Sequence, residues 1–285
     1  MASMRDIKRR KSSITSTQQI TKAMKLVSTV KLQKARSKAE YSKPYSNFMY
    51  ETVRSILTKS TNIDHKYLHP GNSGKKAVIM ITSNRGLAGG YNSNITKLIM
   101  GSGIPKEEMI IYPIGRKGRD TMTRKGYQMA TDYSEVINDP LYKDAIDISE
   151  ELLHGFEKGE ISEIYLAYTS FKNTVSQIPK MEQLLPVAMD ETAVSKEDQI
   201  IPMNYEPNEE EVLDMVIPKY MTSLIYGALL ECVASENGAR MTAMDAATSN
   251  AEEMIDTLSL EYNRARQGSI TQELTEIIAG AEAIS

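Results

Sequence analysis

The sequence predicts a mixed α/β protein in which both ends of the chain are long helices and a smaller α/β domain is inserted between them. Residues 3–43 contain neither proline nor glycine, and no proline follows Pro218. Between these segments, apolar runs at residues 77–82 and 109–114 alternate with helical patterns. Such runs are typical of strands buried on both faces of a sheet. The fold class is therefore α/β with a helical coiled coil.

The N-terminal segment, residues 1–57, is predicted to be one long helix that bends or pauses at Pro44. Ser3 and Asp6 have the spacing of an N-terminal capping box. The helix has a sparse apolar seam of Met4, Ile7, Ile14, Ile20, Met24 and Val27. Residues 58–76 are polar and rich in turn formers, which predicts a linker in which His65 and His69 are solvated.

The inserted domain is predicted at residues 75–190. Strands are expected at residues 77–82, 109–114, 164–170 and 176–187, and helices at 94–100, 116–126 and 143–158. The loop "SNRGLAGGYNSN" follows the first strand, but its glycines fit neither a Walker loop nor a dinucleotide fingerprint. We therefore expect no nucleotide site, with glycines that shape a strand-to-helix turn and Arg85 as a solvated loop residue.

The C-terminal segment, residues 207–285, is predicted to be a helix capped by Asn208 and Glu211. Its heptad seam runs through Met241, Met244, Thr248, Ala251, Ile255, Leu258, Tyr262 and Ala265, then continues, shifted by one residue, through Ile270, Leu274, Ile277, Ala281 and Ile284. Both terminal helices join the same domain, so they should run antiparallel, with the last one projecting by roughly 20 residues, about 30 Å. Residues 267–285 carry only three charged side chains, which predicts that another protein covers this tip.

Charge and cysteine content exclude several classes of protein. Residues 1–40 carry 11 Lys and Arg against 2 Asp and Glu, whereas residues 201–285 carry 4 against 15. The single cysteine, Cys232, excludes an internal disulfide and is expected to be buried. No apolar run approaches the ~20 residues of a membrane span, and no signal peptide is recognised, so we expect no direct membrane insertion and a cytoplasmic location. The sequence predicts no catalytic residues, no cofactor and no metal site.

Four segments together resemble the gamma subunit of the F-type ATP synthase, in its bacterial form, over nearly the whole chain. They are "ITKAMKLVSTVKL" at 20–32, "SNRGLAGGYNSN" at 83–94, "IYGALLECVASENGARMTAMDAATSNA" at 225–251 and "YNRARQGSITQELTEIIAGA" at 262–281. The resemblance implies an antiparallel coiled coil with an inserted Rossmann-like α/β domain that lacks a nucleotide site. It also implies a central rotor shaft on the cytoplasmic face of the cell membrane, peripheral to it. This shaft would couple ion-driven rotation of the membrane ring to ATP synthesis or hydrolysis, with protons or sodium as the ion.

The same resemblance implies contact residues for each partner in the complex. A loop of one beta subunit would meet Arg266, Gln267 and Thr271, and the acidic loops of the beta subunits would meet Lys8, Arg9, Met24 and Lys25. The membrane ring of c subunits and the epsilon subunit would meet Tyr205 and Glu206. The tip residues Leu274, Ile277 and Ile278 would form a bearing inside the ring of alpha and beta subunits.

Two other functions remain open on the residues alone. The basic N-terminal helix could bind nucleic acid, because the eleven cations among residues 1–40 can neutralise phosphates. The α/β domain could belong to a nucleotide-dependent enzyme, although the required motifs are missing.

Overall fold

The structure is a computed structural model that describes residues 3–59, 65–71, 74–187, 206 and 208–282. The chain divides into two compact units. One unit, Thr29–Ala239, contains the sheet, and we call it the foot unit. The other, Met1–Ser28 with Arg240–Ser285, is the coil unit. Two long helices, α1 (Met4–Lys59) and α5 (Glu209–Glu282), contribute to both units.

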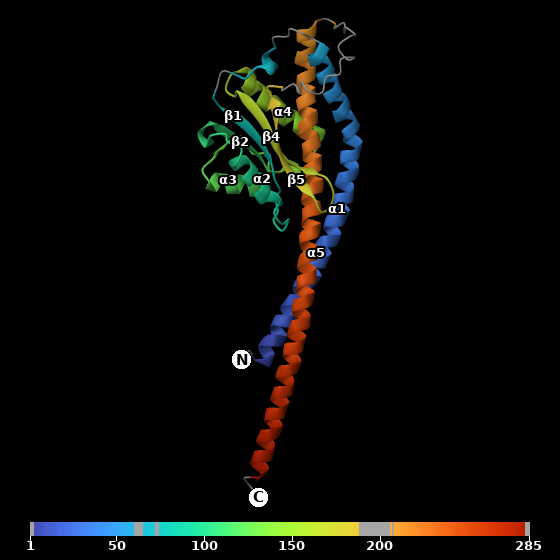
Figure 1. Cartoon of the computed structure of the whole chain (residues 1–285), viewed down its shortest axis with the longest axis vertical. Coiled ribbons are helices and arrows are strands. Elements are labelled where there is room, and N and C mark those ends of the chain that lie inside the picture. The colour runs from blue at the N-terminus through green and yellow to red at the C-terminus, as the bar shows by residue number, and fades with distance from the viewer. Residues whose placement is uncertain (1–2, 60–64, 72–73, 188–205, 207, 283–285) are drawn as a thin grey trace. The chain divides into compact units, whose positions relative to one another are not determined.

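The foot unit is built on a five-stranded sheet of order β3-β2-β1-β4-β5 (Figure 1). The strands are β1 (Lys76–Ile81), β2 (Met109–Ile114), β3 (Gln128–Met129), β4 (Glu163–Phe171) and β5 (Gln177–Leu185). The first four are parallel and β5 pairs antiparallel with β4. The predicted α/β fold class is confirmed.

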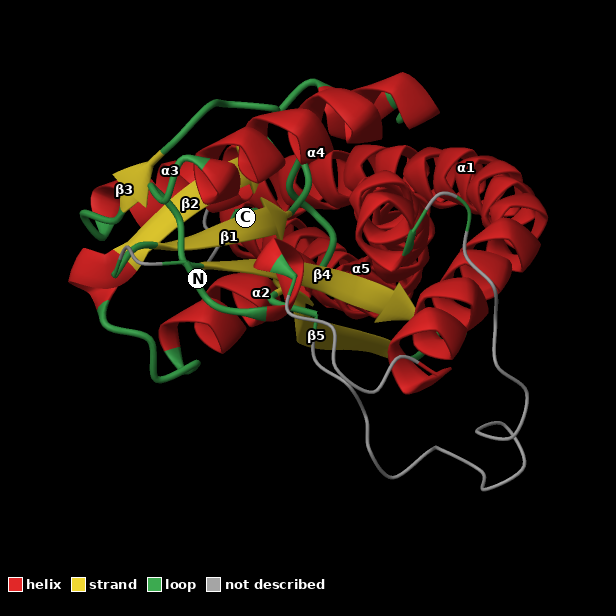
Figure 2. Ribbon diagram, turned by 90° about the horizontal axis from the view of Figure 1, so that it is seen from above, coloured by secondary structure: helices red, strands yellow, loops and turns green. Residues whose placement is uncertain are grey.

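Helices cover both faces of the sheet (Figure 2). Alternate residues of β1 point to opposite faces, as the period of a strand requires. Val78 and Met80 pack in a cluster with α2 (Tyr91–Met100) and α3 (Arg116–Arg124). Ile79 and its neighbours in register pack in a second cluster with α4 (Tyr142–Glu157), α1 and α5. Cys232 belongs to the second cluster and is fully buried, and its burial raises the pKa of the thiol to about 12.

Short 3-10 helices connect several of these elements: η1 (Lys66–Leu68), η2 (Lys106–Glu108) and η3 (Val136–Asn138). The structure corrects the prediction that His65 is solvated, because its side chain is buried next to η1. His65 Nδ1 accepts a hydrogen bond from the backbone N–H of Tyr67, and Nε2 lies 3.3 Å from Asp214 Oδ1. No sequence motif indicates this burial, because the His65 side chain caps a short 3-10 helix that no local residue pattern predicts. His69 is exposed, as predicted.

An ion-pair cluster fixes η1 to α4 and α5. The Tyr67 hydroxyl donates a hydrogen bond to Glu157 Oε1 at 2.6 Å. Lys66 Nζ lies 2.9 Å from Glu157 Oε1 and 2.9 Å from Asp214 Oδ1. The hydrogen bond from Tyr67 has the largest effect on the pKa of Glu157, followed by the one from Lys66. Together they hold that pKa below its ordinary value, although partial burial acts to raise it.

Proline does not interrupt either long helix. The sequence predicts a bend or a pause at Pro44; the pause is wrong, because α1 is continuous to Lys59. A helical proline leaves one carbonyl, here that of Glu40, without its intrahelical donor. Glu40 and Pro44 are both exposed, so water can satisfy that carbonyl.

In the coil unit, the seam of α1 is more polar than predicted. Buried positions recur at heptad spacing at Ile7, Thr21 and Ser28, whereas Ile20 and Val27 are 61% and 58% exposed. The predicted seam is therefore wrong at Ile20 and Val27, because small hydroxyl residues rather than the largest apolar ones occupy the heptad positions. On α5 the predicted seam is confirmed at Met244, Ala251 and Leu258, which are all buried.

Candidate functional site

The two helices of the coil unit are antiparallel, as predicted. Thr21 Oγ1 lies 2.8 Å from Thr248 Oγ1, and one turn further along α1 Lys25 Nζ lies 2.5 Å from Asp245 Oδ1. Residue numbers rise along one helix of an antiparallel pair as they fall along the other. Counting back from the Thr21–Thr248 contact therefore sets Met4, the first residue of α1, opposite Ala265. The part of α5 beyond Ala265 extends past the start of α1 (Figure 1).

The overhanging part of α5 carries the first group of predicted contact residues. Arg266, Gln267 and Thr271 are all exposed. Thr271 Oγ1 donates a hydrogen bond to the Gln267 carbonyl at 2.9 Å. The continuation of the seam finds no cover within the described chain, because residues 270–281 are all exposed. The shifted seam predicted there is therefore not a seam between α1 and α5.

Large apolar side chains lie bare on this overhang. Leu274 is 55% exposed, Ile277 68% and Ile278 59%. Apolar side chains gathered on one exposed segment mark a surface that binds another protein. The overhang thus has the exposure that a bearing contact requires.

The basic end of α1 carries the second group. Lys8 and Arg9 are exposed, and Arg9 makes only a long 3.8 Å ion pair with Asp6 one turn earlier. Met24 is half-buried. Lys25, however, is already paired with Asp245 within the chain, so it differs from the other predicted cations.

A further exposed apolar surface on α1 was missed from the sequence. It consists of Ile20, Leu26 and Val27, each between 58% and 63% exposed. Ile20 and Val27 are one heptad apart, so they share one face of the helix. A strict heptad count from Ile7 assigns Thr21 and Ser28, rather than Ile20 and Val27, to the buried positions of α1.

Only part of the third group can be located. Glu206 is exposed, whereas Tyr205 lies outside the described residues. The predicted cap of α5 is confirmed, since Asn208 Oδ1 accepts the backbone N–H of Glu211 at 2.9 Å. The first turn of α5 also carries the acidic residues Glu209, Glu210 and Glu211, which complement the positive end of the helix dipole.

The carboxyl edge of the parallel sheet is where α/β domains usually bind ligands. In this chain the residues that directly follow β1 accept hydrogen bonds from the N-terminus of α3. The backbone N–H groups of residues 116, 117 and 118 donate to Asn84 Oδ1, the Ser83 carbonyl and Thr82 Oγ1, at 2.9, 3.0 and 3.0 Å. A phosphate at this helix end would need those same donors. The three backbone donors at the start of α3 are therefore already bonded to acceptors within the chain.

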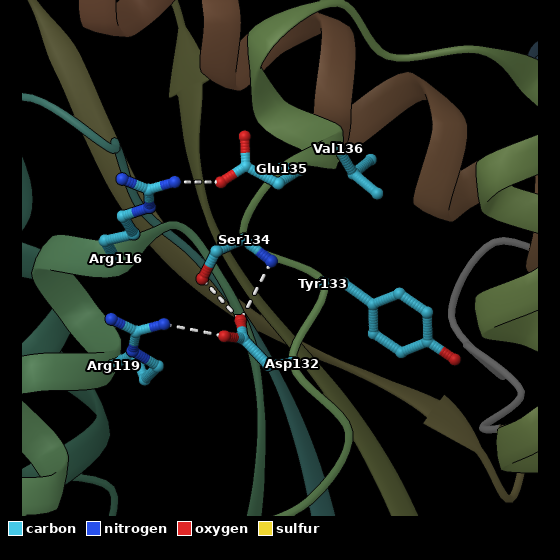
Figure 3. Close-up of a pocket in the computed structure, with 7 residues that line it drawn as sticks. All are labelled: Arg116, Arg119, Asp132, Tyr133, Ser134, Glu135 and Val136. Atoms are coloured by element: carbon cyan, nitrogen blue, oxygen red, sulfur yellow. Dashed lines mark hydrogen bonds and ion pairs between the residues drawn. The ribbon is translucent and has the colours of Figure 1, made fainter.

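A pocket of 390 Å³ beside this edge has its charges paired in the same way (Figure 3). Arg116 bonds to Glu135, and Arg119 Nη1 lies 2.7 Å from Asp132 Oδ2. Partial burial acts to raise the pKa of Asp132, but the bonds from Ser134 and Arg119 outweigh it and hold that pKa below its ordinary value. The backbone donors at the start of α3 and the charged side chains of this pocket are thus satisfied within the chain.

Two other features are absent from the described residues. Among them, no three His, Cys, Asp or Glu side chains gather closely enough to hold a metal ion. Across the same described ranges, no helix of 18 or more residues has the sustained hydropathy of a bilayer-spanning segment.

The fold and its exposed surfaces define a coiled-coil protein with an inserted α/β domain and surfaces suited to protein partners. Comparison with known proteins gives its family. The family model described as ATP synthase matches residues 3–284. The ATP synthase gamma chain of Lachnoclostridium phytofermentans is 64% identical, with both chains covered completely. The sodium ion specific gamma chain of Acetobacterium woodii is 41% identical over 99% of each chain. The chain belongs to the ATP synthase gamma chain family, and none of these relatives supports the nucleic-acid alternative.

Solved structures agree with this fold. A chain in the Euglena gracilis mitochondrial ATP synthase aligns with a TM-score of 0.70 over 99% of this chain and 94% of that one, at 18% identity. A chain from the rotor of the same complex in another rotational state aligns with a TM-score of 0.65 over 94% of this chain and 98% of that one.

Proposed function

We propose that this chain is the rotating shaft of its ATP synthase, a non-catalytic subunit that carries torque between a membrane ring and the catalytic beta subunits. The observation that carries the proposal is the antiparallel coil whose longer helix continues as a bare apolar overhang. A shaft must present such a surface to the proteins around it, and an isolated apolar helix would otherwise be costly in water.

The overhang would sit inside a ring of alpha and beta subunits. Leu274, Ile277 and Ile278 would form the bearing surface, which is apolar and carries no charge that a particular neighbour must match. Arg266, Gln267 and Thr271 would bond to a loop of one beta subunit. Polar contacts of this kind change as the shaft turns, whereas apolar contacts are less directional.

The basic end of α1 would face acidic loops of the beta subunits. Lys8 and Arg9 are exposed, and the ion pair of Arg9 with Asp6 is long at 3.8 Å, which suits electrostatic pairing with a partner. Met24 would contribute apolar contact, and Lys25 would contribute less than its neighbours because Asp245 already holds it. The apolar surface of Ile20, Leu26 and Val27 would extend the same contact.

Allosteric work requires contacts that differ between the states of a partner. The coil unit meets this requirement, because its basic and apolar exposed residues are unevenly distributed around and along the two helices. Each beta subunit of a pseudo-threefold ring would therefore meet a different side of the shaft at any moment. Rotation would then move the catalytic sites through open and closed states in sequence.

The foot unit would bind the membrane ring of c subunits and the epsilon subunit, through Tyr205 and Glu206 at the turn into α5. This contact would hold the chain at the cytoplasmic face of the cell membrane without insertion. The ion, proton or sodium, would be selected in the membrane ring, since this chain's role is mechanical.

Replacement of Glu206 tests the foot contact. We expect Glu206→Ala in the reconstituted complex to leave ATP hydrolysis running while fewer ions are pumped per ATP. Glu210→Ala, which removes an exposed carboxylate in the first turn of α5, should leave the ratio of pumping to hydrolysis unchanged. An unaltered ratio for Glu206→Ala would remove this residue from the contact.

A further inference from the structure

A second cavity, of 610 Å³, lies within the foot unit between α1, α5 and the hairpin that joins β4 to β5. Its size is in the range of small-molecule sites, roughly 300 to 1,000 Å³. None of the partner contacts proposed above uses its lining residues.

Small side chains on both helices create the cavity. Ala39, Ser42 and Ser46 line it from α1, and Gly227 and Ala228 line it from α5. A Cβ atom built on Gly227 would have only one neighbour within 4 Å, Ser46 Oγ at 3.7 Å. Glycine is unfavourable inside a helix compared with alanine, and here it leaves open space instead of allowing close packing.

The cavity has defined walls. Ser223 Oγ donates a hydrogen bond to Ser46 Oγ at 2.9 Å, which joins the two helices directly beside the open space. On the hairpin side, the backbone N–H of Phe171 donates to Glu231 Oε2 at 3.2 Å and fixes the hairpin to α5. The rings of Tyr168 and Phe171 add aromatic surface to the lining.

The lining contains three cationic and two acidic side chains. Arg36 and Glu40 neutralise each other across 2.8 Å. Lys43 and Lys172 are exposed, and within the described ranges no carboxylate pairs with either ammonium. Glu231 is the other acid in the lining, and the Phe171 N–H already occupies one of its oxygens. The lining therefore combines apolar side chains with two exposed cations that no described carboxylate pairs.

We propose that this cavity binds an amphipathic organic anion, a molecule with an aromatic or aliphatic body and one carboxylate, sulfonate or phosphate. The body lies against Tyr168, Phe171, Leu224 and the small residues of the two helices, and the anionic group meets Lys43 and Lys172. Binding joins α1, α5 and the β4–β5 hairpin through one ligand, and so stabilises the foot unit in its folded state.

Anilinonaphthalenesulfonate, which has an aromatic body and one sulfonate, is a suitable probe for fluorescence titration of the full-length chain. We expect one saturable site in addition to weak binding elsewhere. Gly227→Leu places a side chain in the cavity and is expected to remove that site, with the melting temperature equal to or above that of the parent. Gly268→Leu is the matched control, because Gly268 is another helical glycine of α5 with no atom within 4 Å of a built Cβ, and it lies outside the cavity. It should retain the site.

A second pair of variants tests the charge without altering the interior. Lys43→Gln with Lys172→Gln should weaken probe binding by about tenfold, whereas Lys97→Gln with Lys125→Gln, two exposed lysines elsewhere on the foot unit, should leave it unchanged. Displacement by laurate would identify an aliphatic, lipid-derived anion, and displacement by naphthoate alone a soluble aromatic acid. Absence of a saturable site, displacement by neither compound, or parental binding by the Gly227→Leu or lysine variants would overturn the proposal.

Discussion

Replacing Arg266 and Gln267 together with alanine separates function from stability. Both side chains are exposed on the overhang of α5. Surface substitutions of this kind usually change the free energy of unfolding by less than about 0.5 kcal/mol, so the isolated chain should melt as the parent does. Inside the complex these side chains would be buried against a beta subunit.

The functional effect follows from that burial. Truncating one member of a buried, hydrogen-bonded charge pair costs about 2 to 5 kcal/mol, much of it from the partner left unsatisfied. About 1.4 kcal/mol corresponds to a factor of ten in rate, so the lower end of that range already exceeds tenfold. We expect ATP-driven rotation and ATP synthesis in the reconstituted complex to fall at least tenfold.

Arg264→Ala is the matched control, because Arg264 is also exposed on α5 and lies two positions away, about 200° around the helix from Arg266. It should cost much less. Removal of residues 279–285, mostly apolar bearing surface, should have a milder effect than the double substitution. If the double substitution rotated like the parent while the truncation stopped turnover, the apolar seating of the tip would be the functional element and the reasoning from polar contacts would be refuted.

Three further predictions concern the basic helix, the turn before α3 and a foot carboxylate. Neutralising residues 8–11 together should weaken assembly with the alpha and beta subunits and reduce the dependence of assembly on salt, since each exposed ion pair is worth ~0.2 to 1 kcal/mol. Assembly titrations at low and high salt measure the affinity and its salt dependence. Parental values of both would show that the cluster only aids solubility. Gly118→Ala should destabilise the chain by about 1 to 3 kcal/mol in urea unfolding, because its Cβ would lie 2.5 Å from Thr82 Oγ1, whereas Gly86→Ala, with its nearest neighbour at 3.9 Å, should be nearly neutral. Because the folded-state pKa of Glu157 is lowered, its carboxylate stabilises the fold above the unfolded value of about 4.3, and this contribution is lost as pH falls through the folded value. Glu157→Gln should therefore lower stability at pH 7 and lose less of it on acidification, and a parental acid profile would contradict this.

Much of the fold was predictable from the sequence because its periodicities are strong. The continuous apolar runs of β1 and β2 reflect burial on both faces of a parallel sheet. The seam of α5 is readable because apolar residues occupy most of its heptad positions, with Thr248 as an exception. The seam of α1 was misassigned because Thr21 and Ser28 hold buried positions while Ile20 and Val27 face outward. Hydrophobicity alone cannot detect a seam made of small hydroxyl residues.

Some features of the candidate sites were also predictable from the sequence, and others were not. The missing glycine motifs predict no nucleotide site in the α/β domain, and this stays a prediction. The structure adds that Thr82, Ser83 and Asn84 accept from the backbone donors at the start of α3. Single-sequence patterns could not reveal the burial of His65 or the pairing of Lys25 with Asp245, because both depend on contacts between residues far apart in the chain. The predicted partner contacts stay predictions, although the exposure of the overhang suits them.

Direct observation of rotation tests the central claim. The one cysteine, Cys232, is fully buried, and burial raises the pKa of its thiol, so a thiol-reactive probe should spare it. Thr123→Cys places a new, exposed thiol on α3 of the foot unit. With the catalytic subunits immobilised and a particle attached at residue 123, ATP should drive rotation in one direction, with three equal steps in each turn. A particle that stayed fixed or moved randomly while ATP was hydrolysed would contradict the proposal that this chain is a rotor.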